Sequence, residues 1–300
     1  MNTNTSNGVG SPGCARSSAA TPVLAISYEG RPNTLLEAVV GRVGALEITP
    51  DCLTLAGHAA PNPVLLEHVD ELLPTSPVTY HGIGLSMGTA TGWNDDYLRL
   101  LDAMCAWRMP LLHSEHLGYT TVDGSFLGAM PALPTTLEAA NLVIERATRL
   151  RRHLGIECLL EHVASPLPRT TEMRLASWLN LVCRESGCGM LLDLYNLECD
   201  ADNGFIDLAQ FLDEIDTTLV GEIHLAAGVW HEGLHLDVHS HLTERSTLDL
   251  LTAVLPRCPN LRIVTYEILS AAVPIVGVEK IAGHIGELGA LLSEVHYATL

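Results

Sequence analysis

Histidine and acidic side chains are concentrated in one stretch of the sequence, GEIHLAAGVWHEGLHLDVHSH, which spans residues 221–241 and contains five of the chain's 14 histidines. Asp237 and His239 are two residues apart, and side chains with this spacing point to the same side of an extended chain. A carboxylate and an imidazole placed in this way can bind one metal ion. We expect these two residues and His224 to be metal ligands. We expect the other three histidines to lie in solvent or to support the ligands through hydrogen bonds; they are His231, His235 and His241.

Polar residues also end or interrupt several other apolar runs. His81 follows VTY, Glu115 and His116 interrupt the run before LGY, and Glu161 follows two leucines in LLEHV. Each has an ordinary alternative role, such as a core hydrogen bond, a buried ion pair or, for Asp193, a helix cap. Nine such groups at the ends of separate runs are hard to explain one by one. The nine candidate ligands are His81, Glu115, Glu161, Asp193, Asn196, His224, Asp237, His239 and Glu267.

These groups are carboxylates and imidazoles with one amide, and they require no thiolate. Such a set suits iron, manganese or zinc better than a structural cysteine–zinc site. Nine groups exceed what one ion can hold, so we expect two or three ions that share bridging carboxylates.

The composition narrows the possible partners and the compartment. The chain has a formal net charge of −19, which disfavours nucleic acid and suits cations. Its eight cysteines form no C-x-x-C pair, which is typical of free thiols in a reducing cytoplasm. No apolar run is long enough to cross a membrane. Residues 1–22 are rich in Ser, Thr, Asn and Gly, and we expect a disordered leader followed by one domain over residues 23–300.

Short apolar runs alternate with stretches of helical spacing along the rest of the chain. We count eight runs, which begin near residues 23, 45, 78, 110, 157, 189, 220 and 262. Runs that are apolar throughout suit a parallel sheet buried on both faces, which means either a (β/α)₈ barrel or an open doubly wound sheet. The candidate ligands decide between the two, because the strand ends of a barrel form a ring around one mouth. We therefore predict a TIM barrel.

The motifs HGIGLSMG, SEHLGY, LLEHV, GCGMLLDLYN, EIHLAAG and DVHSH occur in order between residues 45 and 270. They resemble the multinuclear non-haem iron-dependent oxidases (the MNIO family), whose best-known member makes methanobactin. The resemblance implies a xylose isomerase-like TIM barrel with two or three irons, in mixed Fe(II) and Fe(III) states. It also implies that O₂ is used to modify a residue, often cysteine, of a ribosomally made precursor peptide. A small partner protein that binds the peptide leader is implied as well.

Carried onto this sequence, the resemblance makes all nine candidates iron ligands, with Glu161 bridging. The residues expected to act in catalysis are His81, Glu115, Asp193 and His224. His116 and His162 are expected to support the ligands through hydrogen bonds. The chain departs from the family pattern at four places. Two lie early in the chain: VLAISYEGRP in the first run, and EITPDC, with Glu47, Thr49, Asp51 and Cys52. The other two are His162 and Val163, which follow Glu161, and Tyr195, which precedes Asn196.

Three alternatives remain open. The spacing of His224, Asp237 and His239 is similar to that of the zinc-dependent endonuclease IV barrels, but the net charge and Asn196, where a histidine is expected, disfavour a nuclease. A sugar isomerase usually requires a catalytic lysine, and lysine is scarce here. A metal-binding or peptide-binding module without turnover is the third alternative.

Overall fold

Eight strands form a closed barrel in which every strand pairs in parallel with two neighbours. The computed structural model describes residues 21–54 and 59–299. The barrel strands are β1 (Val23–Tyr28), β2 (Ala45–Ile48), β3 (Val78–Gly82), β4 (His113–Leu117), β7 (Cys158–His162), β8 (Gly189–Asp193), β9 (Val220–Leu225) and β12 (Ile263–Tyr266). Their order around the barrel is β1, β12, β9, β8, β7, β4, β3 and β2. The closed sheet confirms the predicted TIM barrel over an open one.

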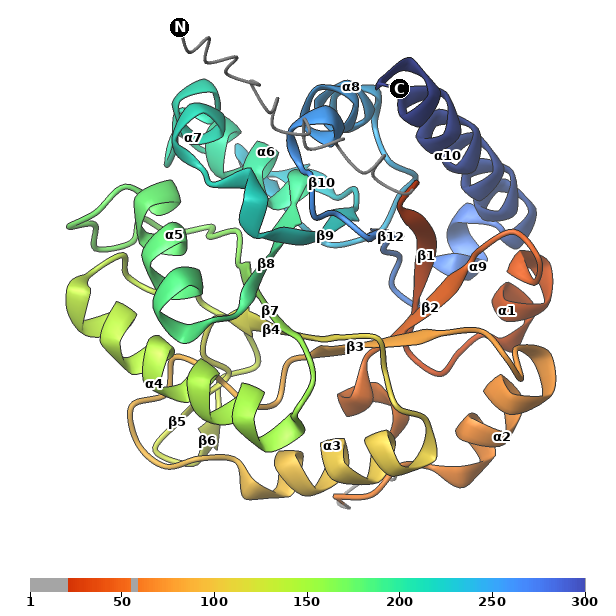
Figure 1. Cartoon of the computed structure of the whole chain (residues 1–300), viewed down its shortest axis with the longest axis horizontal. Helices are drawn as coiled ribbons and strands as arrows, with labels where there is room; N and C mark the ends of the chain where they lie inside the picture. The colour runs from red at the N-terminus through yellow and green to blue at the C-terminus, as the bar shows by residue number, and fades with distance from the viewer. Residues whose placement is uncertain (1–20, 55–58, 300) are drawn as a thin grey trace, which may run out of the picture.

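Helices form a ring outside the strands (Figure 1). They are α1 (Asn33–Val39), α2 (Pro63–Leu72), α3 (Asp95–Trp107), α4 (Leu137–Leu154), α5 (Leu175–Ser186), α6 (Leu194–Asp202), α7 (Leu208–Glu214), α8 (Arg245–Val254), α9 (Val273–Val276) and α10 (Val278–Thr299), with short 3₁₀ turns at Pro50–Leu53, Thr217–Leu219 and Leu255–Arg257. All eight apolar runs are strands, although the run near residue 110 becomes a strand only at His113. The predicted disordered leader falls mainly on residues 1–20, which lie outside the described part of the chain.

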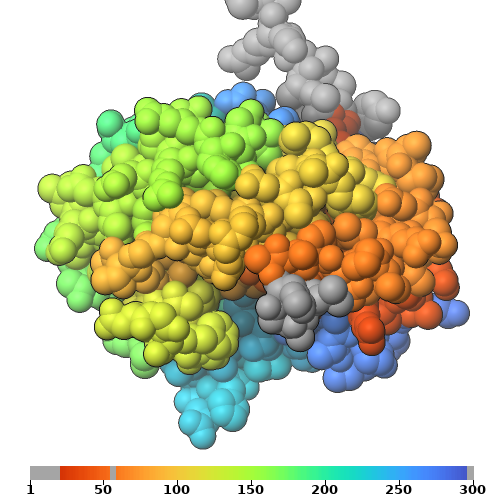
Figure 2. All heavy atoms as spheres, turned by 90° about the horizontal axis from the view of Figure 1, so that it is seen from below, coloured from red at the N-terminus to blue at the C-terminus, as the bar shows by residue number. Residues whose placement is uncertain are grey.

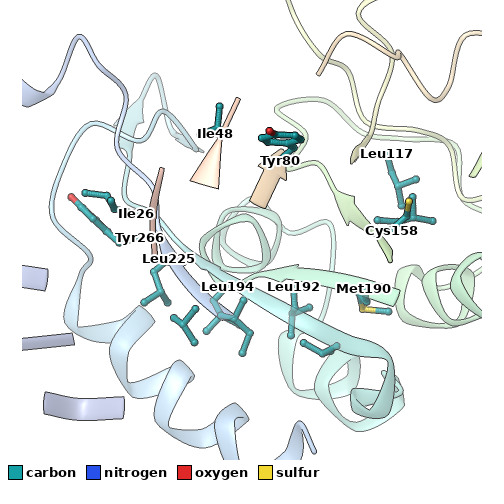
Figure 3. Close-up of a cluster of buried hydrophobic side chains, with 14 of the residues drawn as sticks. Ile26, Ile48, Tyr80, Leu117, Cys158, Met190, Leu192, Leu194, Leu225 and Tyr266 are labelled. Carbon is teal, nitrogen blue, oxygen red and sulfur yellow. The ribbon is translucent and has the colours of Figure 1, made fainter. Parts of the chain in front are cut away.

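Side chains alternate between the inside of the barrel and the helix layer, as successive residues of a strand must. One layer inside the barrel is apolar and consists of Ala25, Ala45, Leu112, Leu159, Leu191 and Ile263. Residues of the opposite parity pack against the helices, and Figure 3 shows Ile26, Ile48, Tyr80, Leu117, Cys158, Met190, Leu192, Leu225 and Tyr266 in this outer core. The parity of a residue therefore decides whether it can reach the barrel mouth.

Local sequence signals define the helix ends that matter for the site. The Thr136 side chain accepts a hydrogen bond from the Ala139 amide and caps α4. Asp193 ends β8 and also caps α6, because its Oδ1 accepts a hydrogen bond of 2.7 Å from the Asn196 amide. The cap fixes one carboxylate oxygen of Asp193, while the other, Oδ2, has no hydrogen bond to any residue that the structure describes.

Two hairpins lengthen the loops that follow barrel strands. Strands β5 (Thr121–Val122) and β6 (Ser125–Phe126) follow β4, while β10 (Val229–His231) and β11 (Leu234–Leu236) follow β9. In Figure 2 the β10–β11 hairpin, in cyan, projects from the body of the molecule, and the yellow-green β5–β6 region lies on the same side. Both hairpins stand at the C-terminal end of the barrel, since each begins where a barrel strand ends.

The seven cysteines in the described part of the chain are free, and five of them are buried. This agrees with the free thiols that the composition predicted, while Cys14 falls outside the described residues. Over residues 21–54 and 59–299, none of the helices combines the length and the apolar character that a membrane span requires.

Candidate metal centre

The C-terminal ends of the barrel strands carry a buried set of acidic and histidine side chains. Four overlapping groups have ligand atoms close enough to share a metal ion. These groups are Glu47, His81 and His224; His81, His116 and Glu161; Glu161, Asp193 and His224; and Asp193, His239 and Glu267. Because neighbouring groups share residues, they form one continuous cluster across the mouth of the barrel.

Eight of the nine predicted ligands lie in or against this cluster. Asp237 contacts His239, with 2.8 Å between Oδ2 and Nε2. The Asn196 amide donates to Glu161 Oε1 and to the carbonyl of residue 162, both at 3.2 Å. The remaining six are His81, Glu161, Asp193, His224, His239 and Glu267. The ninth, Glu115, lies outside the cluster.

The register of β4 explains why Glu115 is separated from the others. His116 is paired with Glu161 on β7, whereas Glu115 is paired with Leu160, which belongs to the outer core. Glu115 therefore faces the helix layer, where its Oε1 contacts His113 Nε2 at 3.0 Å. The placement of Glu115 as a ligand is corrected, and His116, expected only to support the ligands, takes the inward position.

His81, His116 and Glu161 converge on one point. The two Nε2 atoms are 3.2 Å apart, and Glu161 Oε2 lies 3.2 Å from His81 Nε2 and 3.3 Å from His116 Nε2. Adjacent ligands of one ion lie about 3 Å apart when each bond is about 2.1 Å. Glu161 Oε2 has no hydrogen-bond partner among the described residues. A divalent cation fits this triangle and would satisfy all three atoms.

Hydrogen bonds on the far side of each ring fix how the two histidines are oriented. His116 Nδ1 lies 2.9 Å from the Gly82 carbonyl, which can only accept, so Nδ1 carries the hydrogen and Nε2 keeps its lone pair. His81 Nδ1 lies 2.7 Å from Ser114 Oγ, whose own hydrogen is directed at the Tyr80 carbonyl. Both Nε2 lone pairs therefore face the cluster, which is the usual arrangement of metal-binding histidines.

His224 links the rest of the cluster and is fully buried. Its Nε2 is hydrogen-bonded to Glu47 Oε2 at 2.9 Å. Its Nδ1 is 2.9 Å from Glu267 Oε2, yet the two atoms are not aligned as a hydrogen bond, and neither has a partner among the described residues. A ring nitrogen and a carboxylate oxygen at this distance can share either a proton or a metal cation, so a cation fits here as well.

Glu47 is a member of the cluster that the sequence interpretation did not select. It was noted only as part of a departure from the family pattern. In ALEI it stands two residues after Ala45, which points into the barrel, so the alternation of the strand was a usable signal. Glu222 lies inside the barrel on β9, where it accepts a hydrogen bond of 2.7 Å from the Thr265 hydroxyl.

The electrostatics of the cluster require a positive charge or several protons. Burial, together with the neighbouring carboxylates of Asp237 and Glu267, raises the pKa of Asp193 to about 8. Burial also raises the pKa of Glu161 well above its usual value. Burial alone would lower the pKa of His224, but the adjacent Glu267 and Glu47 raise it well above its usual value. A bound cation would replace these protons and let the carboxylates ionise.

His162 lies outside the cluster, because it follows the inward-facing Glu161 and so points to the helix layer. Its ring is 6.4 Å from the ring of Phe211, and neither ring nitrogen has a hydrogen-bond partner among the described residues. Burial lowers its pKa to about 3, so the ring is neutral. The expected supporting role of this ring is not found; only its backbone carbonyl supports the site, by accepting from Asn196.

A second polar cluster occupies the outer side of β3 and β4. Glu115 contacts His113 there and lies beside the Tyr97 hydroxyl, and a side chain at Gly82 would collide with both Glu115 and Tyr97. Asp51 is adjacent and accepts a hydrogen bond of 3.0 Å from the Ile83 amide. Burial and, to a lesser extent, the neighbouring Glu115 raise the pKa of Asp51 to about 6.

The raised pKa of Asp51 gives a pH-dependent prediction. Its folded pKa of about 6 exceeds the unfolded value of about 3.9, so the folded state binds more protons between these values. The Asp51 contribution to the free energy of unfolding therefore falls as pH rises from about 4 to about 6, by on the order of 1–3 kcal/mol. In urea unfolding between pH 4.5 and 8, Asp51→Asn should gain stability relative to wild type as pH rises. The exposed Asp213→Asn is the control, and identical pH slopes for all three proteins would contradict the prediction.

The fold and the cluster together define a class: a (β/α)₈ barrel with carboxylate and imidazole groups gathered at the C-terminal strand ends, where barrel enzymes place their active sites. Within that class, residues 33–266 match the family described as RiPP precursor modification enzyme MbnB/TglH/ChrH, where RiPP denotes a ribosomally made, modified peptide. The chain belongs to this family, which confirms the resemblance indicated by its motifs. Family and fold both point to an enzyme.

Curated relatives carry the name UPF0276 protein. The relative from Psychromonas ingrahamii is 29% identical over 188 residues, which cover 61% of this chain and 66% of that protein. The relative from Rhizorhabdus wittichii is 32% identical over 163 residues, covering 54% and 59% of the two chains. The matched regions thus span about two thirds or less of these two relatives.

Solved structures of low sequence identity share the fold. Endonuclease IV from Thermus thermophilus superimposes with a TM-score of 0.57 at 19% identity, covering 91% of this chain and all of that one. D-psicose 3-epimerase from Clostridium cellulolyticum gives a TM-score of 0.58 at 11% identity, covering 92% and 99%. At these identities the likeness concerns the barrel alone.

Proposed function

We propose that this protein is a multinuclear non-haem iron enzyme that uses O₂ to oxidise a residue, a cysteine, of a ribosomally made precursor peptide. The observation that carries the proposal is the triangle of His81, His116 and Glu161. Two histidines and one carboxylate on one face of an ion are typical of non-haem Fe(II) oxygenases. None of the four described ligand groups includes a cysteine, which further disfavours a thiolate–zinc site. Membership of the precursor-modification family supports the peptide substrate.

The residues present fit two or three irons. His81, His116 and Glu161 would hold one ion, and Glu161, Asp193 and His224 a second, so that Glu161 bridges them. Asp193, His239 and Glu267, with Asp237 and Asn196 beside them, would hold the outermost ion. When bound, iron would supply O₂ activation and one-electron oxidation.

The chain's own residues orient and protect this centre. Ser114 and the Gly82 carbonyl hold the rings of His81 and His116, and Glu47 holds His224 from behind. The inner ligands are almost wholly removed from solvent, since His81, Glu161, Asp193 and His224 are at most 3% exposed. Such burial strengthens the electrostatic interactions of the site and limits reactions with water.

The substrate would enter from the C-terminal end of the barrel, where the β5–β6 and β10–β11 hairpins stand (Figure 2). A small partner protein that binds the peptide leader is part of the proposal. The seven free cysteines support a reducing compartment, and we place the reaction in the cytoplasm.

The proposal is tested by oxygen-dependent modification of a peptide. The chain is co-expressed with short cysteine-containing peptides encoded beside its gene, and the purified pair is incubated with Fe(II) with and without O₂. A mass change that requires both iron and O₂ is expected, located at cysteine by fragmentation. Full activity with zinc and without O₂ would contradict the proposal and favour a hydrolase.

A further inference from the structure

Tyr195 departs from the family pattern and takes part in a chain of hydrogen bonds beside the metal groups. It lies on α6, and its ring is 1% exposed and packs with Cys199, Ala226 and Ala227. Its hydroxyl lies 2.7 Å from His235 Nε2 on β11. It also meets the Gly228 amide, just before the hairpin begins. Tyr195 therefore connects α6 to Gly228, just before the β10–β11 hairpin, and to His235 on its second strand.

The hydrogens in this chain can be assigned from its far end. His235 Nδ1 is 2.8 Å from Asp202 Oδ2, and a carboxylate only accepts, so Nδ1 carries the hydrogen. His235 Nε2 is then an acceptor, and the Tyr195 hydroxyl donates to it. Hydrogen bonds are thus donated in one direction, from Tyr195 to His235 and from His235 to Asp202. Both ring nitrogens of His235 have a partner.

The hairpin is also held through its backbone and one aromatic ring. The Asn203 side chain accepts from the His235 amide and donates to the His235 carbonyl, both at 2.8 Å. The Trp230 ring stacks on the His235 ring, with 4.7 Å between centroids and 4° between planes. Trp230 and His235 both belong to the hairpin, so the stacking stabilises the hairpin itself. Trp230 is 61% exposed and the hairpin projects from the body (Figure 2), so the contacts of His235 with Tyr195, Asp202 and Asn203 carry much of its attachment.

The end of this hairpin leads directly into two candidate ligands. Strand β11 ends at Leu236, and Asp237 and His239 follow. The Ser240 amide donates to the Ala227 carbonyl at 2.8 Å and closes the loop. At Gly228 a side chain would collide with the Leu236 carbonyl, so the two ends of the loop are in backbone contact. Any displacement of β11 is therefore passed on to Asp237 and His239.

We propose that Tyr195, His235 and Asp202 are positioning residues for the outermost metal ion. They attach the hairpin to α6, whose first turn carries Asn196 and whose cap is Asp193. One helix thus sets four of the five groups of the outer site: Asp193 and Asn196 from its N-terminus, and Asp237 and His239 through the hairpin. The fifth, Glu267, follows β12. The inference rests on the metal binding in the proposed function, but not on iron, O₂ or the peptide substrate.

The test is a stepwise titration of apo-protein with Co²⁺, followed by absorbance and calorimetry. Tyr195→Phe removes one hydroxyl and keeps the buried ring. We expect it to weaken the outer binding step by about 10–100-fold, as loss of a ligand-supporting contact does, and to leave the inner step unchanged. Tyr80→Phe is the matched control, because Tyr80 is also fully buried, precedes the ligand His81 and bonds two carbonyls, but faces α3.

A double-mutant cycle separates positioning from a general loss of stability. His235→Phe keeps the stacking on Trp230 and removes both hydrogen bonds. If the chain acts as a unit, Tyr195→Phe with His235→Phe should weaken the outer step no more than either change alone. Additive losses in the double variant would overturn the inference. So would identical Co²⁺ titrations of Tyr195→Phe and Tyr80→Phe, or a Tyr195→Phe variant whose Co²⁺ affinity falls equally at every binding step. A wild-type protein that binds no metal would instead overturn the proposed function.

Discussion

Glu161→Gln is expected to be the most damaging single substitution in the cluster. Glu161 Oε2 contacts the Nε2 atoms of both His81 and His116, and the same residue belongs to a second group with Asp193 and His224. Glutamine keeps the volume but removes the negative charge and one of two acceptor oxygens. We expect metal affinity to fall by more than about 100-fold at two binding steps, which exceeds the effect of losing a supporting contact. Elemental analysis after gel filtration and turnover of the precursor peptide would measure both effects.

Glu198→Gln is the matched control for this substitution. Glu198 lies on α6 and bonds the Thr247 hydroxyl, away from the four metal groups. The Glu198→Gln variant should bind as much metal as the wild-type protein. If Glu161→Gln retained that complement as well, the assignment of Glu161 as the bridging ligand would have to be abandoned.

The second large effect is expected from a comparison of two adjacent residues. His116→Ala removes an inward imidazole and should cost at least about 100-fold in metal affinity at the inner site. Glu115→Gln alters a buried contact with His113 on the other side of the strand. It should leave metal binding intact and lower the free energy of unfolding by about 1–3 kcal/mol. Metal titration and urea unfolding of both variants measure the two effects separately.

This comparison tests the register of β4 directly. The pairing of His116 with Glu161 puts both side chains inside the barrel, and the pairing of Glu115 with Leu160 puts both outside. The reverse result, in which Glu115→Gln loses metal and His116→Ala keeps it, would mean that the strand is shifted by one residue. It would restore Glu115 as a ligand.

The fold was predictable because each barrel strand is buried on both faces and so appears as a short, mainly apolar run that polar residues end or interrupt. The position of the site was predictable for a related reason: a polar residue at the end of such a run is expensive to bury unless it is paired. The D-x-H spacing of Asp237 and His239 also predicted that they lie together, and they are in contact. These conclusions need only local sequence and the geometry of a barrel.

The errors concern which side of a strand a residue faces. In PLLHSEHL, Leu112 points into the barrel and Leu117 into the outer core, so the apolar residues that flank Glu115 and His116 indicate opposite parities. Only pairing with the neighbouring strands decides between them. The inward position of Glu47 follows from the alternation after Ala45, but in the sequence it stands out only as a departure from the family pattern.

Interactions between distant segments could not be predicted from the sequence. Tyr195 and His235 are separated by 40 residues and meet only because the hairpin folds back onto α6. His162 presents the opposite case, since nothing in the sequence showed that its ring would face Phe211 and not the metal groups. In both cases the identity of the residue indicated possible chemistry, and its partners decided the outcome.

The central claim is that the barrel mouth holds a cluster of irons through His81, His116, Glu161 and the groups that overlap with them. The most direct measurement is anaerobic reconstitution of the apo-protein with Mössbauer-active Fe(II), followed by removal of unbound metal, iron analysis and Mössbauer spectroscopy. We predict two or three irons per chain in more than one coordination environment, with one environment lost in His116→Ala. A chain that retains at most one iron, or that prefers zinc and gives the same iron content with and without His116, would contradict the claim.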